Sequence, residues 1–117
     1  MKPDFQTCGL AKTLKVIGSK WTLAIIYELD GGPKRFNDLQ RTLQMSPRTL
    51  SLRLVQMEQD RIISKKVFAE MPPHVEYALT RKGQSLEAII GSMCEWGSKV
   101  RVSATVPEKV AKSQVKA

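Results

Sequence analysis

The 117-residue sequence is poor in the residues that catalytic and metal sites use. It has one histidine, His74, and two cysteines, Cys8 and Cys94, which form no Cys-x-x-Cys pair. A structural zinc site is therefore not expected. A nucleophile–base pair would have to use the sole histidine, which has no partner nearby in the sequence. Phosphate-binding glycine loops and paired-carboxylate motifs are also missing, so we expect a protein that is not an enzyme and has no metal or cofactor.

Membrane and secretion signals are lacking as well. No apolar run approaches the roughly 20 residues of a membrane span, and residues 1–6 have no apolar segment of a signal peptide. Two cysteines fit a reduced cytoplasmic compartment better than a disulfide-rich secreted protein. Acidic residues are scarce, because 11 Asp and Glu stand against 19 Lys and Arg, a net charge of +8. That charge suits a polyanionic partner, either nucleic acid or an anionic membrane surface.

The length allows a single domain, and the spacing of apolar residues predicts mainly helices. Leu10, Leu14 and Ile17 give residues 7–17 one buried stripe, with Thr7 as a candidate cap. A second helix follows from Trp21 to Leu29, and residues 30–33 (Asp-Gly-Gly-Pro) end it. A third helix of about two turns is predicted over residues 36–43.

The fourth helix is the best defined by sequence. Ser46 can cap it, and Pro47 suits the first helical position, where no backbone donor is needed. Its buried stripe is expected at Leu50, Leu54 and Met57. At about 100° per residue the opposite face carries the polar side chains; these are Arg48, Leu52, Gln56 and Gln59, with Thr49 and Arg53 flanking them.

Two strands, residues 62–68 and 75–79, are predicted to form a hairpin whose tip contains Pro72 and Pro73. Thr80 is expected to cap one long last helix, whose apolar stripe runs from Leu86 to Val100. A chain of this size offers little surface to cover that stripe, so a homodimer is expected. We predict an N-terminal arm (1–6), a DNA-binding and dimerisation domain (7–101) and a basic, mobile C-terminal tail (102–117).

Several motifs, in the right order between Cys8 and Gly97, resemble the HxlR-type transcriptional regulators. They are Lys20-Trp21-Thr22-Leu23, the segment from Gly32 to Leu39, the segment from Pro72 to Gly83, and Trp96-Gly97. The resemblance implies a dimeric winged helix-turn-helix protein that dimerises through its first and last helices. It also implies that the fourth helix enters the major groove of DNA while the hairpin, or wing, reaches the neighbouring backbone or minor groove.

Three residues depart from that family pattern. Arg61 stands where the family often has glycine, and a left-handed conformation there would cost arginine about 1 kcal/mol or more, which favours a different turn. Gly9 replaces a proline after Cys8, which leaves the sensor role known for some members open. His74 replaces an arginine in the wing, which implies weaker or pH-dependent contact with DNA.

The predicted DNA-binding residues fall into two groups. Arg48, Thr49, Arg53 and Gln56, behind the cap Ser46, are predicted to reach the groove, since Arg pairs with guanine and Gln with adenine. Lys34, Arg35, Lys65 and Lys66 are predicted to contact phosphates, which positions a protein without reading sequence. His74 is expected to contact DNA from the wing or to be simply exposed. For each of these residues a plain solvated surface is the alternative.

The two cysteines receive different predictions. Cys8 lies near a helix N-terminus and Lys12, an environment that stabilises a thiolate, so it is a candidate redox sensor. The alternative is a half-buried thiol in a dimer interface. Cys94 lies at the edge of the last apolar stripe and is expected to be buried and inert. A disulfide between the two cannot be judged from sequence.

The sequence is thus interpreted as a homodimeric regulator that binds a near-palindromic duplex and acts as a repressor, because no activation surface is evident. An effector is not identifiable. A non-specific nucleic-acid-binding protein, dominated by its net charge, is one alternative. The other is a winged-helix module that binds protein through the fourth helix, which Leu52 and Val55 keep open.

Overall fold

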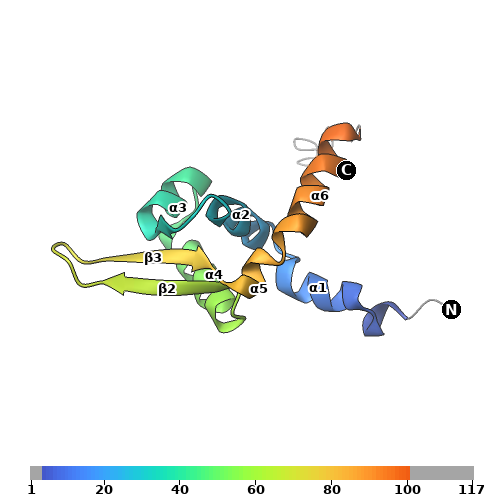
Figure 1. Cartoon of the computed structure of the whole chain (residues 1–117), viewed down its shortest axis with the longest axis horizontal. Helices are drawn as coiled ribbons and strands as arrows, with labels where there is room; N and C mark the ends of the chain where they lie inside the picture. The colour runs from blue at the N-terminus through green and yellow to red at the C-terminus, as the bar shows by residue number, and fades with distance from the viewer. Residues whose placement is uncertain (1–3, 101–117) are drawn as a thin grey trace.

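The computed structural model describes residues 4–100 of the chain. Its elements in chain order are η1 (Phe5–Thr7), α1 (Gly9–Ile17), α2 (Lys20–Leu29), β1 (Lys34–Arg35), α3 (Phe36–Leu43), α4 (Pro47–Gln59), β2 (Ile63–Phe68), β3 (His74–Leu79), α5 (Arg81–Gln84) and α6 (Glu87–Lys99). Figure 1 shows the β2–β3 hairpin extending to one side of the body, with α1 and α6 on the other side and α4 between them.

The core lies where α2, α3 and α4 meet the base of the sheet. Its least exposed side chains are Ile25 and Ile26 of α2, Leu39 of α3, Leu50, Leu54 and Met57 of α4, and Ile62 and Ile63. Full burial of each such side chain contributes roughly 1.5–3 kcal/mol. The structure buries the stripe that was predicted for the fourth helix. The opposite face of α4 therefore points toward solvent.

The sheet has three antiparallel strands in the order β1-β3-β2. Its long pair is in register from Ile63 opposite Leu79 to Phe68 opposite His74, which agrees with the predicted hairpin to within one residue. β1 was not predicted. It pairs Arg35 with Glu76, and two basic residues after a Gly-Gly-Pro turn carry no local signal for a strand.

Arg61, which follows the C-cap of α4, has a left-handed backbone conformation although it is not a glycine. Its φ is 63°, so the different turn favoured by the sequence is wrong. The Arg61 N–H donates to the Glu58 carbonyl oxygen at 3.0 Å, and the Ile62 N–H donates to the Met57 carbonyl oxygen at 2.9 Å. These two bonds complete a Schellman motif, which satisfies the end of α4 and directs the chain into β2.

The single long last helix predicted after Thr80 is also wrong, because the structure divides it into α5 and α6 around Leu86. Thr80 does cap α5, accepting from the Gly83 N–H at 3.0 Å. The same hydroxyl lies 2.6 Å from the Arg61 carbonyl oxygen, and the Lys82 Nζ donates to the Asp60 carbonyl oxygen at 3.0 Å. A Cβ on Gly83 would collide with the Ile62 carbonyl oxygen. We call these contacts the α5 clasp, because they fasten α5 to the end of α4.

The predicted fold class, a mainly α winged helix-turn-helix with a small hairpin, is confirmed: α3, the turn at residues 44–46 and α4 form the helix-turn-helix, and β2–β3 forms the wing. The helix predicted from Thr7 begins at Gly9, with Cys8 rather than Thr7 at the N-cap. No helix within residues 4–100 has the length and apolar character that a bilayer span needs. The predicted C-terminal tail lies outside the described residues.

Candidate nucleic-acid interface

α4 begins with a cap that also uses its neighbour. The Ser46 Oγ accepts from the Thr49 N–H at 3.1 Å and donates to the Thr49 Oγ1 at 3.0 Å. Pro47 occupies the first helical position. The cap holds the first turn of α4 in place, and Arg48, which follows Pro47, is exposed at that end.

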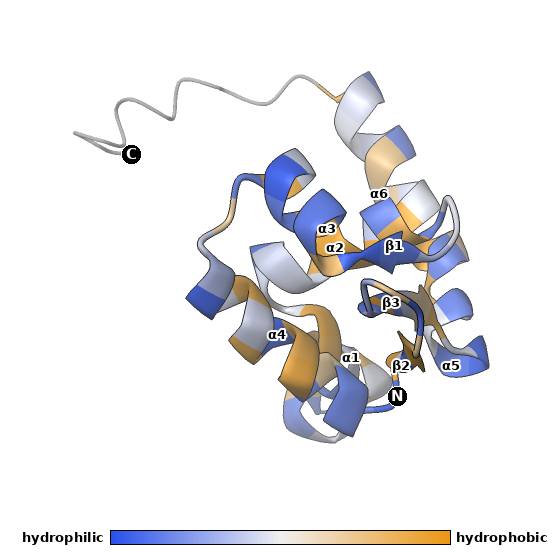
Figure 2. Ribbon diagram, turned by 90° about the vertical axis from the view of Figure 1, so that its left-hand side faces the viewer, coloured by the Kyte–Doolittle hydropathy of each residue, from blue (hydrophilic) through white to orange (hydrophobic). Residues whose placement is uncertain are grey.

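The outward face of α4 is exposed along its whole length and mixes polar and apolar side chains. Arg48, Ser51 and Gln59 are exposed, and Leu52 and Val55 are 63% and 50% exposed. Figure 2 shows this alternation of hydrophilic and hydrophobic segments along α4. Such a face can donate hydrogen bonds to base edges through arginine and contact thymine methyl groups through leucine or valine.

Arg53 and Gln56 lie to one side of that face. Both line a pocket between α4 and the junction of α1 with α2, and Arg53 is half-buried. The Nε atom of Arg53 is buried without a hydrogen-bond partner among the described residues. The same pocket includes Lys15 and Ser19, which sequence reasoning did not single out because they belong to different helices from Arg53.

The four predicted phosphate contacts are not equivalent in the structure. Lys34 is half-buried and its Nζ donates to the Glu28 carbonyl oxygen at 3.2 Å, so its ammonium group is engaged within the fold. Arg35 is exposed at the N-cap of α3. Lys65 and Lys66 are exposed on β2, and as neighbours in a strand they point to opposite faces of the sheet.

His74 is held within the wing. Its side chain is only 13% exposed, with Nδ1 at 3.5 Å from Glu70 and Nε2 at 3.4 Å from Glu76. The ring stacks on Phe68 with centroids 4.7 Å apart, and the Lys66 Nζ lies 5.0 Å from the Phe68 ring centroid. The expectation of a simply exposed histidine is wrong, because the ring organises the hairpin next to its tip.

The wing also contains a tyrosine with a perturbed pKa. Partial burial, and in second place the negative charge of Glu58, raise the pKa of Tyr77 above its ordinary value. Tyr77 lies between Lys34 and Lys65 in the register of the sheet. Its phenol therefore stays neutral at physiological pH and adds no charge to the basic surface around it.

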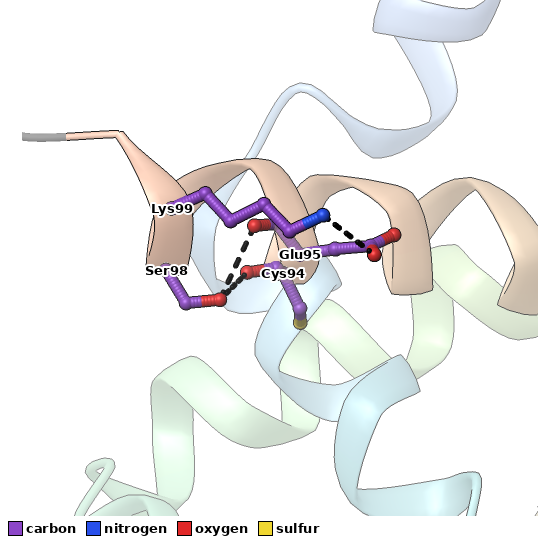
Figure 3. A network of polar contacts seen from close by, with 4 residues as sticks. All are labelled: Cys94, Glu95, Ser98 and Lys99. Carbon is purple, nitrogen blue, oxygen red and sulfur yellow. Dashed lines mark hydrogen bonds and ion pairs between the residues drawn. The ribbon is translucent and has the colours of Figure 1, made fainter.

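The cysteines differ from each other in exposure. Cys8 is half-buried at the N-cap of α1, and the Thr7 hydroxyl donates to the Asp4 carbonyl oxygen instead of capping that helix. Cys94 is exposed, so its predicted burial is wrong. It lines an open apolar pocket of about 340 Å³ with Tyr27 and Met93. Figure 3 shows its sulfur pointing away from the Lys99–Glu95 ion pair on the same helix.

Within residues 4–100, no three His, Cys, Asp or Glu side chains come close enough together to hold a metal ion. Polar groups within residues 4–100 gather instead on the exposed face of α4, on the basic residues of the wing and in the pocket beside Arg53. This arrangement suits an extended anionic partner better than a small substrate.

Comparisons with known proteins agree with that geometry. Residues 16–105 match the family of HxlR-like helix-turn-helix proteins. The uncharacterized HTH-type transcriptional regulator YdeP of Bacillus subtilis is 39% identical over 99 residues, which are 84% of this chain and 77% of YdeP. The redox regulator HypR in its oxidized form is 41% identical, with a TM-score of 0.75 over 81% of this chain and 99% of HypR. The reduced form of YodB from B. subtilis is 31% identical, with a TM-score of 0.73 over 89% of this chain and 98% of YodB.

Proposed function

This chain belongs to the HxlR-like helix-turn-helix family, and from that membership we propose that it is a homodimeric repressor that binds a specific, near-palindromic duplex through α4 and the wing. The family and its relatives are transcriptional regulators. The protein is accordingly a transcriptional regulator with a helix-turn-helix domain, and it is not an enzyme.

The observation that carries the proposal of specific binding is the exposed face of α4. The helix is capped by Ser46 and closed at Arg61, so its exposed side chains are presented by a rigid element. Arg48 stands in the first turn, the part of a recognition helix that contacts base edges in helix-turn-helix proteins. Leu52 lies on the same face as Arg48 and is 63% exposed. A helix face that only met solvent would not need an apolar side chain at that position.

The proposal of a homodimer rests on the other end of the molecule. Large apolar side chains of α1 and α6 are exposed: Leu10 by 57%, Leu14 by 46%, Ile89 by 44%, Met93 by 48% and Trp96 by 63%. An apolar surface of this kind on a soluble domain marks an interface. A two-fold axis between two copies would place two α4 helices in successive major grooves, about 34–36 Å apart.

A response to oxidants through Cys8 is a second proposal. It is supported by the half-buried position of Cys8 at the N-cap of α1. Solved relatives include a redox regulator in its oxidized form and a diamide-treated regulator. We expect Cys8→Ser to remove the change in DNA affinity that diamide produces, with Cys94→Ser as the matched control.

The experiment that tests DNA recognition is fluorescence anisotropy with the duplex upstream of this protein's own gene, at near-physiological salt and with excess random competitor DNA. We expect saturable binding that survives the competitor. Binding that the competitor abolishes, followed by a random-library selection that enriches no sequence, would favour a non-specific nucleic-acid-binding protein. In vitro transcription from the bound promoter then distinguishes repression from activation.

The remaining alternative is a winged-helix module that binds protein through α4. Leu52 and Val55 are the side chains that would support it. In that case Arg48→Ala would leave binding to every duplex unchanged, whereas a DNA-reading helix would lose its preferred sequence.

A further inference from the structure

The polar pocket beside Arg53 has the properties of an anion site. It has a volume of about 250 Å³, and its polar lining residues are Lys15, Ser19, Thr22, Arg53, Gln56 and Asp60. They come from the end of α1, the start of α2 and the second half of α4. The pocket is thus formed by three segments that only the tertiary fold brings together.

Arg53 is the pocket residue best suited to bind an anion. Its Nε–H is the one buried side-chain donor without a hydrogen-bond partner among the described residues, and no carboxylate lies within ion-pairing distance of its guanidinium in that part of the chain. A buried donor that stays unpaired costs free energy. A tetrahedral phosphate can accept two hydrogen bonds from one guanidinium, and a turn of the Arg53 side chain toward the pocket would let the Nε–H be one of the donors.

The charges around the pocket favour an anion. Lys15 and Arg53 contribute two positive charges, and Asp60 contributes one negative charge. The first backbone N–H groups of α2, which begins after Ser19, add positive potential at the same place.

The position of the pocket indicates the source of the anion. In Figure 1 the wing extends from α4 to one side, and α1 lies on the opposite side. The pocket lies at the α1 side of α4. When α4 enters a major groove, the two strands of phosphates that border the groove face the two sides of the helix. The wing reaches one border, and the pocket faces the other.

We propose that this pocket binds one backbone phosphate of duplex DNA, with Arg53 as the bidentate donor and Lys15 as a second positive charge, on the side of α4 opposite to the wing. The proposal rests on the proposed DNA recognition by α4 and deepens it. It assigns Arg53 to positioning the protein on DNA and leaves the reading of bases to Arg48 and its neighbours.

The first test compares Arg53→Gln with the wild-type protein on the preferred duplex and on a random duplex across a salt series. We expect affinity to fall about tenfold on both duplexes, and the slope of log K against log salt to become shallower by about 0.9, the value for one phosphate contact. Lys99→Gln, which removes one positive charge at the far end of α6, is the matched control and should leave the slope unchanged. A variant that loses the sequence preference but keeps the wild-type slope would overturn the proposal.

The second test uses the intact protein and changes the DNA. Single phosphates of the preferred duplex are replaced in turn by neutral methylphosphonates. One position should weaken wild-type binding and have no additional effect on Arg53→Gln, because the contact is already lost. If every position weakens both proteins equally, the pocket does not hold a phosphate. Lys15→Gln should show the same pattern more weakly, and it serves if Arg53→Gln does not fold. A wild-type protein without any preferred duplex would instead contradict the proposed function, and the salt slopes on random DNA would still test the pocket.

Discussion

The two ends of the molecule expose apolar residues in different surroundings. Leu52 on α4 and Trp96 on α6 are equally exposed, at 63%. Leu52 stands with Val55 among polar side chains on a helix that Ser46 caps at its start and a Schellman motif closes at its end. Trp96 belongs to a stripe with Ile89 and Met93 on a helix whose residues are all exposed after Ile90.

The difference supports the proposal that the two surfaces have different partners, nucleic acid for α4 and another copy of the chain for α1 and α6. The α4 surface reaches its final geometry within one chain and combines scattered apolar groups with donors for hydrogen bonds. On α1 and α6 several large apolar side chains, among them Leu10, Met93 and Trp96, are exposed, and the proposed second copy would cover them.

Introducing a glutamate at one end or the other should have the largest effect and should separate the two proposed interfaces. Truncating an aromatic anchor in an interface costs about 2–4 kcal/mol, so Trp96→Glu should raise the dimer dissociation constant at least about thirtyfold. Leu52→Glu, the control with equal exposure, should leave the dimer intact and abolish DNA binding through charge repulsion. Analytical ultracentrifugation and anisotropy measure the two effects, and equal dimer constants for both variants would rule out the α6 interface.

At the α4 end, Arg48→Ala should cost about 1–3 kcal/mol of discrimination at one base position. The loss is expected because Arg48 stands in the exposed first turn of α4. Anisotropy on the preferred duplex and on single-base variants of it measures this loss. Gln59→Ala, on the same face at the other end of the helix, should have a much smaller effect. Equal weakening on all duplexes would make Arg48 a phosphate contact instead.

Also at this end, Arg61→Gly should increase the free energy of unfolding by about 1 kcal/mol, because the residue has a φ of 63° and glycine adopts that conformation without steric cost. For a domain of this size the midpoint of thermal unfolding should rise by roughly 3–5 °C. Arg61→Ala keeps the Cβ and is the matched control, so it should gain nothing. A gain of equal size with alanine would show that the arginine side chain, and not its backbone conformation, is unfavourable.

The smallest effect is expected where α6 meets α2. A side-chain hydrogen bond with Asp30, and to a lesser degree desolvation and the charge of Asp30, raise the pKa of Glu87 above 4.5. The folded state therefore binds this proton more tightly than the unfolded state. Its stabilising contribution is complete below about pH 4.5 and is lost as the pH rises through the raised pKa.

Glu87→Gln should accordingly reduce the change in thermal stability between pH 4.5 and pH 7, as measured by circular dichroism melts at several pH values. Glu95→Gln, on the same helix but paired with Lys99, is the control. If the two variants show the same pH profile, the Asp30–Glu87 contact does not influence stability.

Local patterns predicted the helix-turn-helix well, because its signals are local. Ser46, Pro47 and the stripe at Leu50, Leu54 and Met57 each act within one or two turns, and the structure shows all of them in their expected roles. The strand pair followed from a polar tip with two prolines. Lys65 and Lys66 of the wing could be placed on a strand from the sequence. The β1 strand and the hydrogen bond from Lys34 to the Glu28 carbonyl oxygen depend on contacts that the sequence does not reveal.

The remaining features depend on tertiary contacts. Ser85 and Leu86 carry no helix-breaking signal, so we attribute the division between α5 and α6 to the contacts of Thr80 and Gly83 with Ile62. A helical projection placed Arg53 beside the exposed face of α4, but it could not show that the α1–α2 junction lies next to it. The assignment of residues to bases or phosphates therefore needs the fold.

The α5 clasp fixes the start of α6 close to the C-terminal end of α4. Thr80 and Lys82 are bonded to the carbonyl oxygens of residues 60–62, and α6 begins after only Ser85 and Leu86. Because so few residues separate the two helices, a change in the orientation of α6 in the proposed dimer would also shift the C-terminal end of α4. In the proposed dimer, the angle at which the two α6 helices cross would set the distance between the two α4 helices, and the spacing of half-sites in the operator would be a ruler for that angle.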